Sequence, residues 1–398
     1  MPRATIRTTP CPALPRYLAL LISAILSVAA CHAAPDEPPE PPQLSVPVDD
    51  GADDDIPSPS VTLAEPSGLQ VKTSEGSGQL VHPDAVVFPK SWNGRRFWFA
   101  ATPYPGGNAT YENPSIFQGA STAELTVPAG VTNPLANPTN GAYLSDPDLV
   151  YDPVKDELRM YYRQTTADAD QLYLVTSRNG VQWTSQALIQ TDTRYAMISP
   201  AIVREEDGSW RMWAVTAGPA GCNASTAGLT LNERRSADGL KWGSPTPVSL
   251  VIPGRVPWHW DVQYISSKHE YWALVAAYPN GDNCSRSEVY FARSTDGTRW
   301  VASPSPVLAR GVSYPLRDIV YRSTFKYFAP SDMVAIWFSG ARLQSDGYHY
   351  AVASARYTLT ELMRRVETPN PSASQSRGSE EQAPGARAAR EAFVRAFP

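Results

Sequence analysis

One short motif that occurs three times decides the fold of this chain: S-R-N-G-V-Q-W (177–183), S-A-D-G-L-K-W (236–242) and S-T-D-G-T-R-W (294–300). The copies begin 59 and 58 residues apart. The Asn-Gly or Asp-Gly pair predicts a tight turn between two β-strands, and the following Trp is suited to packing between neighbouring sheets. A period of this length is typical of repeat architectures built from small sheets.

A second element occurs upstream of these turns and is found five times. It reads H-P-D-A-V-V-F from His82, D-P-D-L-V-Y-D from Asp146, S-P-A-I-V-R-E from Ser199, H-W-D-V-Q-Y-I from His259 and L-R-D-I-V-Y-R from Leu316. The third positions are 64, 53, 60 and 57 residues apart: Asp84, Asp148, Ala201, Asp261 and Asp318. Each copy precedes an aromatic strand. Five copies of a three- or four-stranded unit predict an all-β, five-bladed β-propeller over residues 61–366; a β-sandwich with coincidental repeats is the alternative.

The N-terminus carries the features of an export signal. Three arginines precede an uncharged apolar run at 17–30, which predicts a signal peptide over residues 1–30. The run ends in V-A-A-C, which resembles the bacterial lipobox, and Cys31 is then the lipidated residue. Ordinary cleavage after Ala33 is the alternative. We therefore expect an exported protein, either an outer-membrane lipoprotein held by an N-terminal lipid anchor or a periplasmic or extracellular protein.

Two further segments have compositions that do not support a packed core. Residues 31–60 are rich in Pro and acid and predict a disordered linker, and residues 367–398 predict a disordered C-terminal tail. The formal net charge of the chain is −5. Because the acids concentrate in the linker, the propeller itself is nearly neutral, which argues against nucleic acid as a partner and suits an uncharged glycan. We expect a monomer.

Two cysteines remain after the signal sequence and the lipobox. Cys222 and Cys284 fall in equivalent loops of adjacent predicted blades. An even pair in an exported domain predicts a disulfide bond.

The aspartates of the second element are the candidate catalytic groups. The repeat places Asp84, Asp148, Asp261 and Asp318 near the start of the inner strands, around the propeller axis. Neighbouring carboxyl groups raise one another's pKa, which separates acid from base roles. The alternative is that each aspartate only hydrogen-bonds backbone amides.

The repeat and these aspartates resemble the arabinanase, levansucrase and invertase superfamily of five-bladed glycoside hydrolases. The resemblance implies that Asp84 is the base or nucleophile and that Asp148 tunes a pKa, with Asp146 as a rival for the second role. Blade three has Ala201 where the resemblance implies an acid. We therefore assign the third catalytic role to Glu112, which follows a long Pro-Gly loop.

Further residues near the mouth are candidates for sugar binding, since aromatic faces suit the C–H faces of sugar rings. They are His82, Tyr104, Tyr111, Asn113, Asp146, Trp258, His259, Trp260, Asp261, Arg317 and Asp318. Many of the aromatic residues could equally pack between blades, and His82 and His259 could be structural, sugar-binding or ligands of an axial ion. We assign no metal ligand and expect no required cofactor, with a structural Ca²⁺ on the axis as a possibility.

The combined features favour an exported glycoside hydrolase that cleaves a neutral oligo- or polysaccharide by carboxylate acid/base catalysis. The alternative is a non-catalytic surface glycan-binding lipoprotein, which Ala201 favours. A sialidase-like enzyme ranks third: S-x-D-G-x-x-W is similar to the Asp-box, but sialidases have six blades and an arginine cluster.

Overall fold

The computed structural model describes residues 71–120, 125–138, 142–218, 221–223, 229–311 and 318–367. All of them belong to the unit Pro57–Pro398, the second of two into which the chain divides. The predicted signal peptide, Cys31, the acidic linker, the C-terminal tail and Arg317 lie outside the described residues and stay predictions. Among the described residues, no helix has both the length and the apolar character needed to cross a bilayer.

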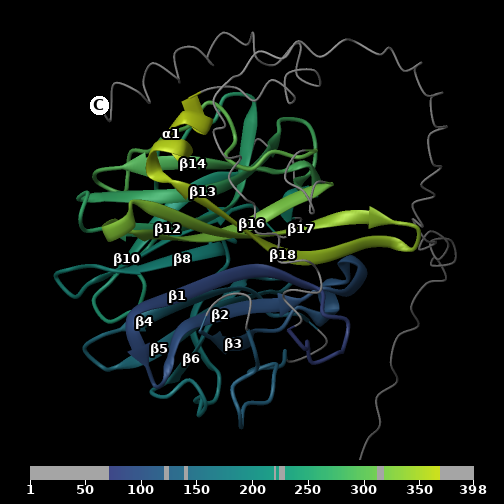
Figure 1. The fold of residues 1–398 in the computed structure, drawn as a ribbon, viewed down its shortest axis with the longest axis vertical. Coiled ribbons are helices and arrows are strands. Elements are labelled where there is room, and N and C mark those ends of the chain that lie inside the picture. Colours follow the sequence, from purple (N-terminus) through teal and green to yellow (C-terminus); the bar gives the residue numbers. More distant parts are fainter. Residues whose placement is uncertain are drawn as a thin grey trace, which may run out of the picture. The chain divides into compact units, whose positions relative to one another are not determined.

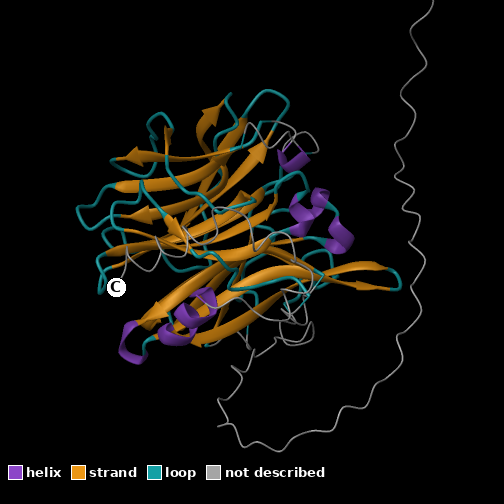
Figure 2. Ribbon diagram, turned by 90° about the horizontal axis from the view of Figure 1, so that it is seen from above, coloured by secondary structure: helices purple, strands orange, loops and turns teal. Residues whose placement is uncertain are grey.

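Five antiparallel sheets make up the described unit, and each is one blade (Figures 1 and 2). Blade one holds β1 (Leu80–Trp92), β2 (Arg95–Pro103) and β3 (Ser115–Gly119); blade two holds β4 (Ser145–Asp152), β5 (Glu157–Thr165), β6 (Asp170–Ser177) and β7 (Ala187–Asp192). Blade three holds β8 (Ile198–Arg204), β9 (Trp210–Thr216), β10 (Thr230–Ser236) and β11 (Thr246–Pro247); blade four holds β12 (Arg255–Ile265), β13 (Glu270–Pro279), β14 (Glu288–Ser294) and β15 (Val301–Ala302). Blade five holds β16 (Ile319–Phe328), β17 (Met333–Gln344) and β18 (Gly347–Thr358), which leads into α1 (Leu359–Glu367).

The five innermost strands close a ring. Each of β1, β4, β8, β12 and β16 contacts the inner strand of the next blade, and β16 also contacts β1. The predicted five-bladed propeller is therefore confirmed. Short 3-10 turns occupy connections between strands: η1 (Pro105–Gly107), η2 (Ala109–Tyr111), η4 (Gly221–Asn223), η6 (Cys284–Arg286) and η7 (Ala329–Ser331).

The repeated turn motif packs against the blade before it in the chain. In its first copy, Ser177 Oγ accepts a hydrogen bond from Gly180 N at 2.8 Å, and Trp183 Nε1 donates to Gly180 O at 3.1 Å. Gly180 has φ +71° and faces the buried Trp98 of blade one so closely that a Cβ would lie 1.9 Å from its ring. Only glycine combines this left-handed conformation with such a close approach.

The start of the inner strand is also shared between blades. His82, Asp146 and Ser199 have φ of 53°, 54° and 52°, and the pairing register shifts around each of them. A bulge of this kind re-aims side chains toward the axis. His82, Asp146 and Ser199 thus occupy the same repeat position in blades one, two and three, and the bulge turns each of them out of the regular side-chain alternation of its strand.

The predicted register of the fifth copy is wrong by six residues. Asp84 accepts a hydrogen bond from Leu149 N, one residue after Asp148, and Asp261 accepts from Phe325 N, one residue after Thr324. Thr324 is thus the fifth-blade equivalent of the repeated aspartate. Asp318 instead precedes β16, where its carboxylate accepts from Leu343 N at 2.7 Å. The L-R-D-I-V sequence matches the pattern, but it lies before the strand that forms the ring.

Candidate functional site

Three of the predicted aspartates do lie on the axis, where they join neighbouring blades. Asp148 accepts from the backbone N–H of Ile202 in blade three at 3.2 Å. Thr324 Oγ1 donates to Asp84 and to Asp261, both at 3.0 Å. All three carboxyl groups are buried. These contacts match the alternative that the aspartates hydrogen-bond the backbone, and they close the ring between blades five and one.

The axial aspartates line a cavity of about 380 Å³. Its other walls come from the C-terminal halves of the inner strands, and Glu112 is not among its lining residues. Burial raises the pKa of all three axial aspartates. The pKa of Asp148 lies well above its ordinary value, and that of Asp261 is raised to about 7. Asp84 and Asp148 therefore share this cavity, whereas Glu112 lies beside His82.

A second polar cluster lies two residues before these aspartates in the repeat. It brings together His82 from β1, Asp146 from β4 and His259 from β12, with one possible ligand atom from each lying within 4.8 Å of the others. Asp146 Oδ1 is 3.6 Å from His82 Nε2 and 3.5 Å from His259 Nδ1. The three residues are 5%, 0% and 2% exposed.

The facing atoms of this cluster are not satisfied by protein hydrogen bonds. Within the described residues, His82 Nε2, Asp146 Oδ1 and both ring nitrogens of His259 are buried without a hydrogen-bond partner. Such atoms are costly unless something else binds them. Ligands of one tetrahedral zinc ion lie roughly 3.4 Å apart, close to the distances from the Asp146 oxygen. Two imidazoles and a carboxylate suit a transition-metal ion such as zinc, manganese or iron better than Ca²⁺, which prefers oxygen ligands.

Electrostatics and burial keep Asp146 and His259 in the forms that bind a metal ion. Burial alone would raise the pKa of Asp146, but the positive charges of Arg163 and Arg322 hold it well below its ordinary value. Arg163 Nε donates to Asp146 Oδ2 at 2.5 Å, and Arg322 Nη1 lies 3.2 Å from Oδ1. Burial lowers the pKa of His259 well below its ordinary value, so its ring is neutral. A carboxylate and a neutral imidazole are the ligand forms a metal needs.

Groups around the cluster hold the two imidazole rings in place. Glu112 Oε2 is 3.1 Å from His82 Nδ1, the nitrogen on the far side of the ring from Asp146. The ring of Tyr321 packs against His82 at 5.6 Å and His259 at 4.6 Å between centroids. Carboxylate–histidine pairs of this kind fix the tautomer of a metal-bound imidazole.

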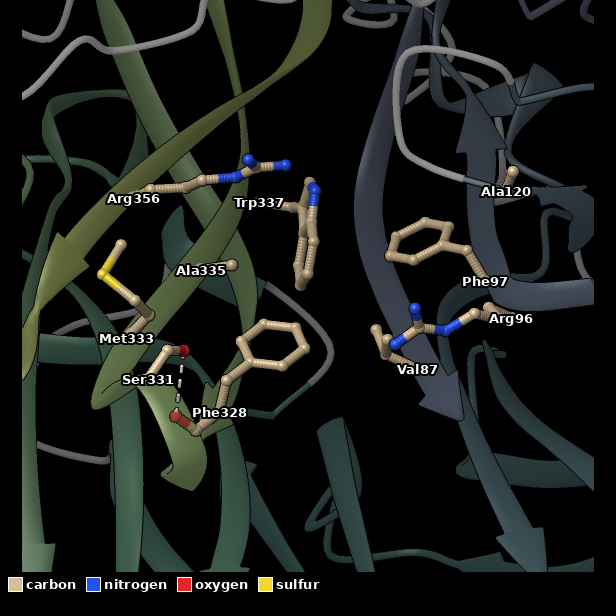
Figure 3. Close-up of a pocket in the computed structure, with 10 residues that line it drawn as sticks. All are labelled: Val87, Arg96, Phe97, Ala120, Phe328, Ser331, Met333, Ala335, Trp337 and Arg356. Carbon is tan, nitrogen blue, oxygen red and sulfur yellow. Dashed lines mark hydrogen bonds between the residues drawn. The ribbon is translucent and has the colours of Figure 1, made fainter. Parts of the chain in front are cut away.

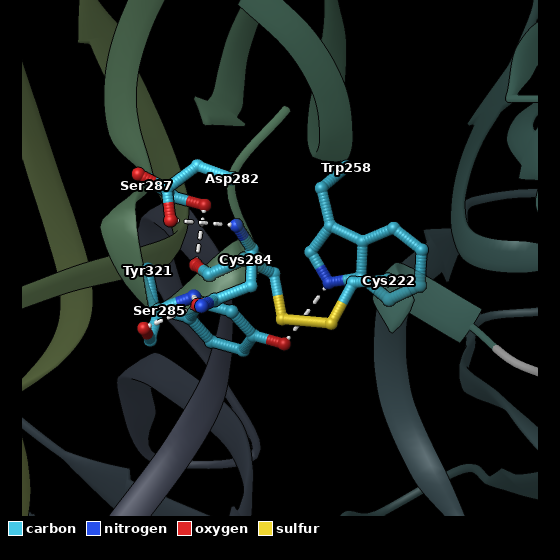
Figure 4. Close-up of a disulfide and its surroundings, with 8 residues drawn as sticks. Cys222, Trp258, Asp282, Cys284, Ser285, Ser287 and Tyr321 are labelled. Carbon is cyan, nitrogen blue, oxygen red and sulfur yellow. Dashed lines mark hydrogen bonds between the residues drawn. A yellow bond between two sulfur atoms is a disulfide. The ribbon is translucent and has the colours of Figure 1, made fainter. Parts of the chain in front are cut away.

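The predicted disulfide is confirmed and lies beside this cluster. Cys222 and Cys284 are bonded, and Figure 4 shows the bridge next to Trp258 and Tyr321. Trp258 Nε1 donates to the Tyr321 hydroxyl at 3.0 Å, and its ring meets His259 edge-on at 5.3 Å. The bridge therefore supports the aromatic pair that packs on His259.

The other predicted sugar-binding residues fall into a core group, which contains Trp260, and a group in the turns that follow β2, which contains Tyr104, Tyr111 and Asn113. Trp260 is 1% exposed and packs against Trp300 between blades, so it belongs to the core rather than to a ligand surface. Tyr104 lies beside the mouth and meets Tyr350 edge-on at 4.7 Å. Tyr111 is 44% exposed on η2. Asn113 follows the same turn and has a buried, unpartnered Oδ1 in the described part of the chain.

A further cavity of about 330 Å³ lies between blades one and five (Figure 3). Its walls are mostly apolar and include Phe97, Phe328 and Trp337, with Arg96 and Arg356 at its edges. None of its described lining residues is a histidine or a carboxylic acid. This cavity therefore lacks the metal-ligand and acid–base groups that His82, Asp146 and His259 provide.

Comparison with known proteins now adds a second line of evidence. No family model matches the chain. It is 29% identical over 336 residues to an A type blood N-acetyl-α-D-galactosamine deacetylase from Flavonifractor plautii, covering 72% of this chain but only 43% of that protein. A crystal structure of an N-acetylgalactosamine deacetylase from F. plautii, in complex with blood group B trisaccharide, matches with a TM-score of 0.68 at 25% identity, covering 73% of this chain and 92% of that one.

Glycosidases share the fold at lower identity. A thermostable family-43 glycoside hydrolase matches with a TM-score of 0.50 at 13% identity, covering 70% of this chain and 88% of that one. A xylan β-1,4-xylosidase from Bacillus halodurans matches with a TM-score of 0.51 at 16% identity, covering 70% and 52%. The predicted likeness to five-bladed glycosidase propellers is thus confirmed at the level of fold.

The predicted reaction, by contrast, is not confirmed. The sequence analysis expected cleavage of O-glycosyl bonds, whereas the relatives at 25–29% identity are named for removing an N-acetyl group, which is hydrolysis of an amide. The prediction of a glycoside hydrolase is therefore wrong.

Sequence reasoning missed three residues of the cluster's surroundings. Arg163, Tyr321 and Arg322 lie on β5 and β16 and contact Asp146 or the histidine rings. A signal for Arg322 existed: it stands two residues before Thr324, as His82 stands before Asp84. It becomes visible only when the fifth repeat is aligned on Thr324 rather than Asp318.

Proposed function

We propose that this chain is a metal-dependent hydrolase that removes the N-acetyl group from an amino sugar of a glycan. The observation that carries the proposal is the convergence of buried, unpartnered ligand atoms from His82, Asp146 and His259. The named activity of the F. plautii relatives supports the same reaction class. The chain spans less than half of the curated relative, so its substrate and its activity are proposals.

The reaction needs water to add to the acetamide carbonyl carbon. The C–N bond then breaks, the nitrogen takes a proton, and acetate and a free amino sugar result. A divalent ion held by His82, Asp146 and His259 supplies the Lewis acidity that polarises a carbonyl and makes a bound water acidic at neutral pH.

The protein's own residues keep that ion site intact. Arg163 keeps Asp146 ionised, so the carboxylate stays in the form that can bind a metal ion. Glu112 Oε2 lies 3.1 Å from His82 Nδ1, and His82 Nε2 is on the side of the ring that faces the cluster. Burial keeps His259 neutral. Export from the cytoplasm stays a prediction, and the Cys222–Cys284 disulfide supports it.

The test is acetate release by the full-length chain from α-N-acetylgalactosaminides and from N-acetylglucosamine oligomers. The protein is stripped with a chelator and then given Zn²⁺, Mn²⁺ or Co²⁺. We expect release to vanish on stripping and to return with one of these ions. His259→Asn should abolish it, whereas the matched control His269→Asn, at an exposed histidine outside the cluster, should not.

Two results would oppose the proposal. Acetate release that is unaffected by stripping and by His259→Asn would remove the metal cluster from the reaction. Glycan binding without acetate release under any metal would instead favour a glycan-binding protein, the function that was the alternative in the sequence analysis.

A further inference from the structure

The hairpin of β17 and β18 continues well past the blade to which it belongs. The two strands pair without interruption from Met333↔Thr358 to Gln344↔Gly347, whereas β16 begins to pair only at Ile319↔Ala341. Residues 342–349 therefore form a two-stranded extension. Figure 1 shows it projecting from the propeller beside the turns of blade one, and β18 contacts η1.

One face of this extension carries a row of apolar side chains. Ala341 pairs with Tyr350 and Leu343 pairs with Tyr348, so these four side chains share a face of the hairpin. Tyr348 is 41% exposed and Leu343 is 61% exposed. Large apolar side chains displayed together on a projecting hairpin commonly mark a binding surface.

The row leads from the hairpin toward the metal cluster. Tyr350 packs edge-on against Tyr104, and a Cβ on Gly107 would meet the Tyr350 ring at 3.4 Å. Tyr104 directly precedes η1, and Glu112 directly follows η2. Glu112 in turn contacts His82.

Backbone contacts from two sides hold the extension in place. Gln79 Oε1 accepts from Tyr350 N at 2.9 Å and from Gly106 N at 3.1 Å, so it ties the hairpin to η1. Asp318 accepts from Leu343 N on the other strand. The apolar face is therefore positioned before any ligand arrives, which lowers the entropic cost of binding.

The charged residues at the tip do not suit an ionic partner. Asp346 and His349 pair with each other at 2.8 Å. The exposed face thus offers aromatic and aliphatic carbon without a single-sign charge field, as the C–H faces of uncharged sugar rings require.

We propose that Tyr104, Tyr350, Tyr348 and Leu343 form an aromatic platform that binds the sugar residues of a glycan beyond the one whose acetamide lies at the His82–Asp146–His259 cluster. This proposal rests on the proposed function, which places the reacting sugar at the cluster and its neighbours toward the hairpin. The preferred substrate is then an oligosaccharide or polysaccharide rather than a monosaccharide.

The experiment uses the full-length chain and the double variant Leu343→Ala/Tyr348→Ala. Both side chains are exposed, so the fold should be retained. Leu188→Ala, at a 50% exposed leucine on β7, is the matched control. The probes are α-N-acetylgalactosaminides of one, three and six residues and N-acetylglucosamine oligomers of the same lengths. Affinity is measured by calorimetry on chelator-stripped protein, and kcat and KM by acetate release after metal addition.

We expect wild-type affinity to rise at least tenfold from one to six residues in one of the two series. The double variant should lose that gain and bind the monosaccharide as the wild type does, with the change in KM rather than kcat. Affinity that does not depend on length in either series, or a double variant that matches Leu188→Ala, overturns the platform. Length-dependent binding without acetate release would keep the platform and reject the deacetylase, so the two failures are distinguishable.

Discussion

The replacement Glu112→Gln tests the candidate metal centre without removing any of its ligands. Glu112 and His82 face each other with 6% of each side chain exposed, and their closest atoms are 3.1 Å apart. Glutamine has nearly the same shape, and its amide can occupy the same place beside His82 Nδ1. The variant therefore removes one negative charge and changes little else.

The expected size of the effect follows from this contact. A hydrogen bond to a charged group contributes about 1.5–3 kcal/mol, and a neutral one about 0.5–1.5 kcal/mol. The charge on Glu112 is thus worth about 1.4 kcal/mol to the imidazole that binds the metal, which is about tenfold in the metal dissociation constant. Changes in the outer shell of metal sites commonly cost about 10–100-fold, so this is the lower end.

The assay is calorimetric titration of the chelator-stripped full chain with Zn²⁺. A second measurement is thermal unfolding at a free Zn²⁺ concentration about 100 times the wild-type dissociation constant, where binding stabilises the wild type by about 2.7 kcal/mol and the variant by about half as much. Glu206→Gln, at an exposed carboxylate outside the cluster, is the control. Equal Zn²⁺ affinity in Glu112→Gln and wild type would refute the role of Glu112, and the absence of any tight Zn²⁺, Mn²⁺ or Co²⁺ binding by the wild type would refute the centre itself.

Three further predictions concern the fold. Gly180→Ala places a Cβ 1.9 Å from the Trp98 ring at φ +71° and should lower the free energy of unfolding by about 3 kcal/mol. The measurement is denaturant titration, and Gly94→Ala, at a glycine with positive φ and no neighbour within 4 Å, is the control. An equal loss in both variants would mean that only the positive φ, and not the contact with Trp98, requires glycine. Thr324→Val removes both hydrogen bonds to the axial aspartates and should cost about 3 kcal/mol, whereas Thr324→Ser should retain most of the stability. The double variant Cys222→Ser/Cys284→Ser opens a loop of 62 residues and should destabilise by about 4 kcal/mol; unchanged Zn²⁺ affinity would show that the bridge does not support the histidines.

The sequence alone was sufficient for the architecture. Turn motifs such as Ser177–Trp183 and the alternating inner strands are local patterns, since a tight turn and a two-residue side-chain period depend on neighbouring residues. Their repetition at intervals of about 60 residues therefore predicted five blades and the pairing of Cys222 with Cys284, both of which the structure has. The axial placement of Asp84 and Asp148 was also predictable from the repeat register.

The site depended on information that no single segment contains. His82, Asp146 and His259 come from three blades, and whether their free atoms face one another depends on how the bulged strands meet at the axis. The repeat pointed to the aspartates two residues later because both sets follow the same pattern. Backbone amides of the next blade satisfy Asp84 and Asp148, whereas the facing atoms of the earlier set have no hydrogen-bond partner in the described part of the chain. The sequence was sufficient to place the side chains of these repeat positions at the axis in blades one, two and four. Only the tertiary structure decided which are left without partners, because hydrogen bonding between distant blades is settled by three-dimensional contact and not by sequence spacing.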